Sequence, residues 1–420
     1  MNPKFHETVP APPAGEGIDS PYAWKRLAAS FALMMFGGSG MYAIMVVLPQ
    51  LQKEFSTGMA GASVPWLATT LGFGFGAIAV GRLSDRFGIF WPSVGGAIFL
   101  GLGFVAAAHA KDLWTLTLIQ GVVISFLGGA ASFLPLVADV SHWFAKRRGL
   151  AMSLCVSGNF AAGAIWPPIL QWLFDAIGWR DTFIWVGLAC MVAMLPLTVF
   201  VARPSPVGQS LPPAAEGASS TRPLGFTPTA LQALLGFAGF CCCVAMAVPQ
   251  VHIVAYCTTL GYGAVNGAHM LALMLAAGIV SRVALGWLSD RIGGLRTLLL
   301  GSSLQAVALA LYVPFDSLGS LYVISLLFGF FQGGVVPSYA LIIREYFRAT
   351  EAGTRTGIVL TVALFGMGMG GWLAGAIYDL TASYRNAFAL GMAANVVNIA
   401  IVVWLIARSR TKAAPAYAGA

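Results

Sequence analysis

One arginine is the residue best placed to do chemistry, because it lies inside a long run of residues without charge. Arg282 is the only Asp, Glu, Lys or Arg between residues 223 and 289. Its guanidinium presents a planar fork of N–H donors that matches a carboxylate. A buried arginine normally pairs with an acid, yet no Asp or Glu lies well inside any apolar run. We therefore expect Arg282 to bind an anionic substrate. The alternative is that it extends to the membrane surface or donates to backbone carbonyls.

Four polar residues in other apolar runs are weaker candidates for the same cavity. They are expected to bind substrate, although each could instead form a hydrogen bond with a neighbouring helix. These residues are Tyr42, Asn159, Gln332 and Tyr339.

Two histidines within apolar runs are candidates for proton coupling. His252 and His269 carry the side chains here that titrate near neutral pH, and interhelical hydrogen bonding is the alternative role. The sequence shows no paired acids, histidine cluster or activated nucleophile, so we expect no enzyme and no catalytic residue. The six cysteines lack CxxC or Cys/His spacing, so we expect no metal and no cofactor.

The composition indicates the elements that must position these side chains. Of the 420 residues 58% are hydrophobic and only 9% are charged, with a mean hydropathy of +0.81. A soluble domain has about 25% charged residues, so this composition excludes a soluble or disordered protein and predicts an integral membrane protein. The apolar runs are continuous and do not alternate in polarity, which favours helices over a β-barrel.

The intervals between charged residues predict the number of membrane spans. About 20 apolar residues cross the hydrocarbon core as a helix. Ten intervals have 19 to 27 residues, and the one at 223–281 has 59, enough for two spans that separate near Gly261-Tyr262-Gly263. Twelve spans follow. The intervals are 27–52, 55–81, 87–110, 113–138, 149–174, 182–202, 223–281, 297–315, 317–343, 356–378 and 386–407.

The distribution of Lys and Arg predicts the orientation. With the N-terminus inside, 18 of the 23 basic residues lie in cytoplasmic segments and only Lys53, Lys111, Arg180 and Arg385 lie outside. Both termini are therefore expected in the cytoplasm, with the chain in an inner or plasma membrane. This asymmetry accounts for the net charge of +8, so we expect no nucleic-acid partner. The expected environment of the protein is the lipid bilayer.

The chain is a tandem repeat. Residues 81–88, Gly-Arg-Leu-Ser-Asp-Arg-Phe-Gly, recur as residues 286–293, Gly-Trp-Leu-Ser-Asp-Arg-Ile-Gly, and Asp175 corresponds to Asp379. A Pro- and Ser-rich stretch separates the copies. We expect an all-α fold of two six-helix bundles related by pseudo-two-fold symmetry. The predicted parts are a tail at 1–24, a bundle at 25–202, a linker at 203–226, a bundle at 227–408 and a tail at 409–420.

The doubled loop motif resembles that of the major facilitator superfamily of secondary transporters. The resemblance extends over roughly residues 20–408, and it implies alternating access around a site near the membrane midplane. It also implies that the motif residues hold the cytoplasmic side closed in one state, because an Asp can cap a helix and pair with an Arg across the bundle. The residues so placed are Gly81, Asp85, Arg86, Gly88, Gly286, Asp290, Arg291 and Gly293.

A second motif is similar to the monocarboxylate porter branch, which includes the oxalate/formate antiporters. Residues 143–151 read Trp-Phe-Ala-Lys-Arg-Arg-Gly-Leu-Ala, and Gly178-Trp179-Arg180 follow. Mammalian members pair an Asp with the eighth-span Arg one turn earlier, but Gly278 occupies that position here. The eleventh span also lacks the Lys expected of a dicarboxylate exchanger. These differences favour a substrate with one carboxylate.

The sequence as a whole predicts a proton-coupled symporter of a small monocarboxylate that functions as a monomer. With no buried acid, a weak acid could bind Arg282 as the anion and leave with a proton. An organic-anion antiporter of the oxalate/formate type and a drug or hydrophobic-compound efflux antiporter remain alternatives.

Overall fold

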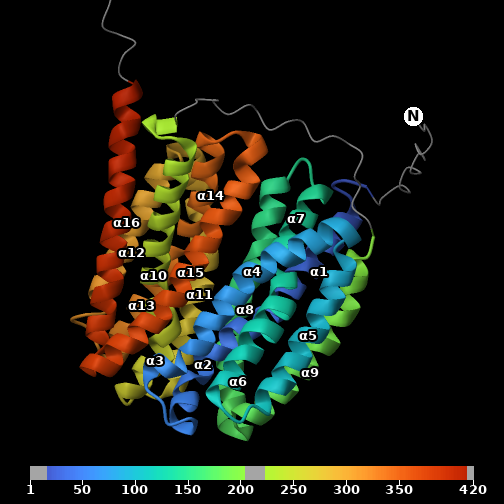
Figure 1. Cartoon of the computed structure of the whole chain (residues 1–420), viewed down its shortest axis with the longest axis vertical. Helices are drawn as coiled ribbons and strands as arrows, with labels where there is room; N and C mark the ends of the chain where they lie inside the picture. The colour runs from blue at the N-terminus through green and yellow to red at the C-terminus, as the bar shows by residue number, and fades with distance from the viewer. Residues whose placement is uncertain (1–16, 204–222, 414–420) are drawn as a thin grey trace, which may run out of the picture.

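The computed structural model describes residues 17–203 and 223–413, and over these ranges its regular elements are all helical. Within these ranges, twelve helices are long and apolar enough to cross a membrane, as the charge-free intervals predict. They form two groups of six that stand side by side (Figure 1). Most of the predicted linker and the outer parts of both predicted tails lie outside the described residues.

The first half contains spans one to six, several of them built from more than one helical segment. In chain order the segments are α1 (Pro21–Gly37), α2 (Ser39–Glu54), α3 (Met59–Ala62), α4 (Val64–Phe87), α5 (Phe90–Ala108), α6 (Leu113–Leu118), η1 (Ile119–Gly128), η2 (Gly129–Ser132), α7 (Leu134–Trp143), α8 (Arg148–Ile177), α9 (Trp179–Thr198) and η3 (Val199–Val201).

The second half contains spans seven to twelve. Its segments are η4 (Pro223–Gly225), α10 (Pro228–Thr259), α11 (Ala264–Ile292), α12 (Gly294–Leu311), α13 (Leu318–Gln332), α14 (Val335–Tyr346), α15 (Ala349–Thr381) and α16 (Tyr384–Ala413). The predicted separation of spans seven and eight is confirmed, because α10 ends at Thr259 and α11 begins directly after Gly263. Gly263 has φ +82°, a conformation that costs glycine little.

Spans one, four and ten are interrupted near their middles. The first changes segment at Gly38, and the tenth changes segment at Gly333 and Gly334. The fourth passes through a π-helix and a short 3-10 helix before α7 starts after Phe133. Interrupted helices free backbone groups for ligands or for packing, and they are common at transporter binding sites. The interruptions in spans four and ten occupy equivalent positions of the repeat.

Close packing of small residues holds the second half together. A Cβ on Gly333 of span ten would lie 2.2 Å from the carbonyl oxygen of Gly278 in α11. Two backbones can approach this closely only where neither residue carries a side chain at the contact. Gly278 thus belongs to a tight α11–α13 contact in addition to its position one turn from Arg282.

The two halves touch at one end of the molecule and separate toward the other. We call the end that carries the start of α1 and the end of α16 the termini side, and the other end the opposite side (Figure 1). Hydrogen bonds join Met59 and Ala60 of α3 to Asp379 of α15, and Trp66 Nε1 to the Met367 carbonyl oxygen. All three bonds lie on the opposite side of the midplane. Nearer the termini side, Gly81 of α4 and Gly286 of α11 have no atoms within 4 Å of an added Cβ.

Candidate functional site

Arg282 lies at the interface between the two halves. Ten residues, about 15 Å of helix, separate it from the end of α11 at Ile292. Its guanidinium carbon stands 4.3 Å from the centre of the Phe160 ring, which belongs to α8 of the first half. Its Nε atom is buried without a hydrogen-bond partner. Within the described ranges no acid forms an ion pair with Arg282, so the cation is balanced only by aromatic and hydroxyl groups.

Tyr42 and Asn159 join Arg282 at this interface. The Tyr42 hydroxyl, from α2, donates a hydrogen bond of 3.3 Å to Asn159 Oδ1 of α8. Tyr42 also lies close enough to the Arg282 guanidinium to interact with it electrostatically. Three helices from both halves therefore bring together a cation, a phenol and an amide, which are groups able to bind a small organic anion.

Two glycines let these side chains come together. A Cβ on Gly163 would lie 2.6 Å from Tyr42 Cζ, so the absence of a side chain there makes room for the phenol. A Cβ on Gly278 would lie 2.7 Å from Phe160 Cε1. The Phe160 ring thus occupies the space that an acid at position 278 would need. This contact gives a physical reason why Arg282 lacks an intrahelical acidic partner.

Gln332 and Tyr339 belong to other polar contacts, inside the second half. Gln250 Nε2 of α10 donates to Gln332 Oε1 at 2.9 Å, while Gln332 Nε2 is buried without a partner. Tyr339 donates to Asn398 Oδ1 at 2.8 Å, between α14 and α16. None of the hydrogen bonds, ion pairs and ring contacts of the described residues joins either side chain to Arg282. Their expected role in substrate binding stays a prediction, and the geometry favours Gln332, which keeps a free N–H, over Tyr339.

The two histidines have different surroundings. His252 is fully buried, and its Nε2 lies 2.7 Å from the Gly371 carbonyl oxygen of α15. Its Nδ1 lies 3.4 Å from the Tyr384 hydroxyl of α16. His269 is exposed near the start of α11. Neither histidine contacts Arg282 among the described contacts. Their role in proton coupling remains a prediction, and the hydrogen bonds of His252 match the interhelical alternative.

The loop motif residues lie apart at the termini side. Asp85, Arg86, Asp290 and Arg291 are exposed, and Arg291 packs its guanidinium over the Trp287 ring at 3.7 Å. The described contacts include no bond from these four residues to the other half. In this conformation the motifs therefore do not hold the halves together, and their expected role in closing this side is a prediction about the other state.

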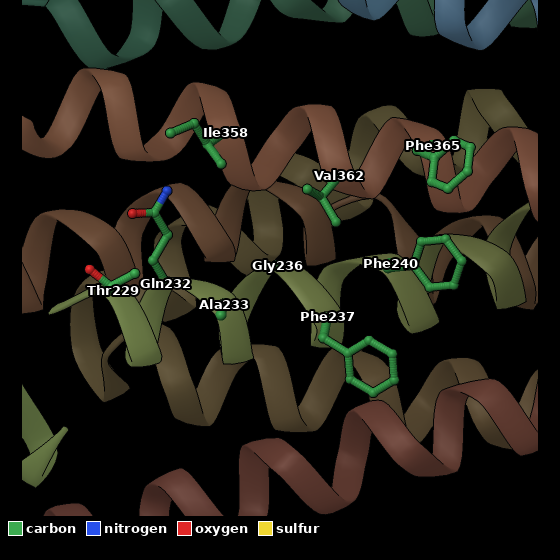
Figure 2. A pocket seen from close by; sticks show the side chains of 9 residues that line it. All are labelled: Thr229, Gln232, Ala233, Gly236, Phe237, Phe240, Ile358, Val362 and Phe365. Atoms are coloured by element: carbon green, nitrogen blue, oxygen red, sulfur yellow. The ribbon is translucent and has the colours of Figure 1, made fainter. Parts of the chain in front are cut away.

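A groove of about 650 Å³ on the second half has a different chemistry. It lies between α10 and α15, and Figure 2 shows Phe237, Phe240 and Phe365 along it. Thr229 and Gln232 are its polar members, and no charged residue lines it. None of the predicted site residues reaches this groove. It can hold an apolar group, whereas an anion requires the Arg282 region.

One arginine that the structure buries almost completely was not singled out by the sequence, which assigns Arg26 to a cytoplasmic segment. Arg26 is 1% exposed and forms a two-pronged ion pair with Asp139 of α7, with distances of 2.7 and 2.8 Å. It also donates to the carbonyl oxygens of Val201 and Arg203, and it stacks on the Trp143 ring. This cluster fastens spans one, four and six of the first half.

Two further site residues could not be recognised from the sequence. Phe160 and Gln250 lie in apolar runs where one aromatic ring or amide resembles many others. The one feature of the sequence that could have pointed to Phe160 is its position next to Asn159, which is a predicted substrate-binding residue. Gln250 carries no local signal, because only the tertiary fold brings its amide within hydrogen-bond distance of Gln332.

Two six-helix bundles with a cation at their interface are an arrangement typical of membrane transporters. Comparison with known proteins gives the family. Residues 29–320 and 296–418 match the sequence profile of the Major Facilitator Superfamily, and the chain belongs to this family.

Curated relatives include proteins named monocarboxylate transporters. The chain is 30% identical over 338 residues to monocarboxylate transporter 13 of Bos taurus, covering 78% of this chain and 76% of that protein. It is 28% identical over 409 residues to monocarboxylate transporter 11 of Homo sapiens, covering 92% and 84%. Another relative is the MFS transporter asaE of Aspergillus flavus, 28% identical with coverage of 72% and 67%.

Solved structures share the fold. A point mutant of the nucleoside transporter NupG matches with a TM-score of 0.70 at 13% identity, covering 92% of this chain and 99% of that one. A bacterial homolog to the human lysosomal transporter Spinster, in an inward-facing and occupied conformation, matches with a TM-score of 0.67 at 18% identity, covering 93% and 96%. At these identities the likeness concerns the architecture.

Proposed function

We propose that this membrane transporter is a proton-coupled symporter of a small monocarboxylate that works by alternating access. The observation that carries the proposal is Arg282, a guanidinium at the interface of the halves with no acidic partner among the described residues. Placing a cation inside the membrane is costly, so such a cation usually has a role in binding a ligand or an ion. The relatives named monocarboxylate transporters support a carboxylate as that ligand.

The binding groups suit one carboxylate better than two. Arg282 offers a planar fork for both oxygens of a single carboxylate, and the Tyr42 hydroxyl and the Asn159 amide lie beside it. No Lys or Arg stands in the eleventh-span interval 356–378 to neutralise a second carboxylate. Phe160 supplies an apolar face for the short carbon chain.

The orientation we propose places the termini side in the cytoplasm, because most Lys and Arg residues belong to that side. The protein then lies in an inner or plasma membrane with its site open to the cytoplasm. In the opposite state the halves separate at Asp379 and close at the two loop motifs, with Asp85 and Asp290 as capping groups and Arg86 and Arg291 as their partners. One chain contains both halves, so a monomer suffices.

Proton coupling need not involve an acid beside Arg282. When the anion and one proton both enter the site from outside and both leave on the cytoplasmic side as the undissociated acid, uptake carries one proton per substrate. The described part of the site contains no carboxylate to relay this proton.

Uptake into proteoliposomes tests the proposal. Labelled monocarboxylates and dicarboxylates are offered with and without an inward proton gradient, using wild type, Arg282→Lys and the surface control Arg296→Lys. Arg296 is exposed on α12 and lies outside the site. We expect gradient-driven uptake of a monocarboxylate that Arg282→Lys abolishes and Arg296→Lys preserves. Uptake unaffected by Arg282→Lys would contradict the assignment.

Two alternatives give different results in the same assay. An organic-anion antiporter of the oxalate/formate type transports only when the vesicles contain a counter-substrate. A hydrophobic-compound efflux antiporter is favoured by the apolar groove between α10 and α15, and its transport should respond to Phe240→Ala and not to Arg282→Lys.

A further inference from the structure

Two glutamines meet inside the second half, near the break in span ten. Gln250 of α10 donates from Nε2 to Gln332 Oε1 of α13 at 2.9 Å, and the two residues are 3% and 2% exposed. This bond occupies the amide oxygen of Gln332, while its Nε2 is buried without a hydrogen-bond partner among the described residues. A buried amide that keeps an unused donor is uncommon, because proteins pair almost all such groups.

The break in span ten packs directly against span eight. These two spans cross the membrane in the same direction, and a Cβ on Gly333 would meet the carbonyl oxygen of Gly278. Gly278 lies fourteen residues after the start of α11, and Gln332 lies fourteen residues after the start of α13. Gln332 therefore stands at the membrane level of Gly278.

The Arg282 guanidinium reaches back to the same level. Arg282 follows Gly278 by about one turn, and helical side chains lean toward the N-terminus of their helix. The Phe160 ring fits this direction, because it lies 4.3 Å from the Arg282 guanidinium carbon and would also meet a Cβ on Gly278. The guanidinium and the Gln332 amide are thus level to within about one helical turn.

Both side chains also leave the contact between α11 and α13 on the same side. Arg282 is rotated about 40° forward from Gly278 around its helix, and Gln332 is rotated about 100° backward from Gly333. In two parallel helices that face each other, opposite rotations turn side chains to the same side of the contact. That side is where Gln250 meets Gln332 and where the first half meets Arg282.

We propose that Gln332 binds a carbonyl oxygen on carbon 2 of the substrate while Arg282 binds its carboxylate. This inference rests on the proposed function and adds a selectivity to it. The unused group of Gln332 is an N–H, which requires an acceptor, and a 2-oxo group places an acceptor beside the carboxylate. A plain carboxylate leaves the donor unpaired. Sites built around a buried polar group discriminate against ligands that cannot satisfy it.

Gln250 acts as a positioning residue for this donor. Its bond to Gln332 Oε1 fixes which end of the amide remains available. A Gln332 side chain turned over would present its oxygen to the substrate oxygen, and two acceptors do not form a hydrogen bond. Because Gln332 Nε2 is covered in this conformation, the neighbouring side chains move aside as the substrate enters.

Equilibrium binding to the full-length protein in detergent tests the proposal without any gradient. 2-Oxobutanoate and butanoate are titrated at neutral pH by calorimetry into wild type, Gln332→Met, Gln250→Met and Gln171→Met. The two acids have the same chain length and charge, and they differ only in the oxo group. Gln171 is the matched control, because it is 3% exposed, donates to Asp175 within α8 and also has one unpartnered amide atom.

We expect wild type to bind 2-oxobutanoate about tenfold more tightly than butanoate, the effect of one additional hydrogen bond. Gln332→Met should lower this ratio to about one and leave the affinity for butanoate within about twofold. Gln250→Met should lower the ratio as well, and Gln171→Met should retain it. A purely structural role of Gln332 would weaken the binding of both acids equally and leave the ratio unchanged.

A wild-type ratio near one, or a ratio that Gln332→Met leaves unchanged, would overturn the proposal. If Gln332→Met does not fold, the wild-type ratio and Gln250→Met still decide the question. Arg282→Lys separates this inference from the proposed function. If both acids bind equally and Arg282→Lys abolishes both, the carboxylate site stands and the role of Gln332 is wrong. If neither acid binds to wild type, both proposals fail.

Discussion

Two arginines lie inside the helical bundles, and their surroundings are opposite. Arg26 is enclosed within the first half, where Asp139, three backbone carbonyls and the Trp143 ring surround its guanidinium. Arg282 stands between the halves, where its partners are the Phe160 ring and the nearby Tyr42 phenol. Arg26 therefore has a structural role, and its guanidinium is hydrogen-bonded within the first half. Arg282 is left able to bind an additional group.

The difference shows how location decides the role of a buried charge. A cation within one bundle keeps the same neighbours through the transport cycle, so a permanent acid can serve it. A cation between bundles changes neighbours when the halves move, and a permanent acid there would compete with the substrate. The following substitutions test this contrast, from the largest expected effect to the smallest.

Arg26→Ala should cause the largest loss, and the loss should be of stability. Removing one partner of a buried ion pair leaves the other charge uncompensated, at a cost of about 3–5 kcal/mol. We expect little folded protein in detergent, as measured by size-exclusion chromatography and thermal unfolding. The double variant Arg26→Met with Asp139→Leu removes both charges and should recover much of this stability. Equal damage in the double variant would show that packing, not charge, dominates.

Arg282→Ala should leave stability nearly unchanged and abolish transport. Truncating a charge that binds a desolvated anion costs about 2–5 kcal/mol, which corresponds to at least a thirtyfold loss of affinity. Substrate-induced thermal stabilisation measures this without any gradient. If Arg282→Ala lowered the melting temperature as much as Arg26→Ala does, Arg282 would be a structural residue and the contrast between the two arginines would be wrong.

Gly278→Asp should convert the free arginine into a paired one. The new side chain meets Phe160, and overpacking of this kind costs about 1–3 kcal/mol. Its carboxylate also competes with the substrate for Arg282. Gly278→Asn is the matched control, because it introduces nearly the same volume without the charge. We expect uptake near neutral pH to be roughly five- to tenfold lower for Asp than for Asn. Equal rates would mean that steric conflict alone acts here.

Tyr42→Phe should have the smallest effect. It removes a hydroxyl that donates to Asn159 at 3.3 Å, and such a bond contributes about 0.5–1.5 kcal/mol. We expect a KM raised by up to about tenfold with little change in maximal rate. Tyr256→Phe is a suitable control, since Tyr256 packs on Phe388 within the second half. A large fall in maximal rate would assign Tyr42 to the movement of the halves.

The sequence predicted the fold well because membrane burial leaves a strong signal along the chain. Eleven charge-free intervals, one of them long enough for two spans, follow directly from the cost of placing charge in lipid. Arg282 could be identified from the sequence for the same reason, because it is a charged residue inside an apolar run. Arg26 was missed because it precedes the first interval by one position, and nothing local distinguishes a loop arginine from one folded back into the bundle. The residue that could have indicated its burial is its partner Asp139, which directly follows the fourth charge-free interval.

The direction in which each polar side chain points was less predictable. Tyr42 and Asn159 meet beside Arg282, whereas Tyr339 turns to Asn398 in its own half. These outcomes depend on the rotation of each helix about its axis, which packing against neighbours decides. The interruptions of spans one, four and ten shift that rotation along a single span. A periodicity argument that assumes one continuous helix therefore fails beyond each interruption.

The closed opposite side has a consequence for how binding is measured. A ligand that arrives from the termini side meets the site as the structure shows it. A ligand that arrives from the opposite side binds only the fraction of molecules in which Met59, Ala60 and Trp66 have left α15. Its apparent dissociation constant equals the intrinsic one divided by that fraction. The same intrinsic site therefore gives two apparent affinities, and their ratio measures the free energy of opening.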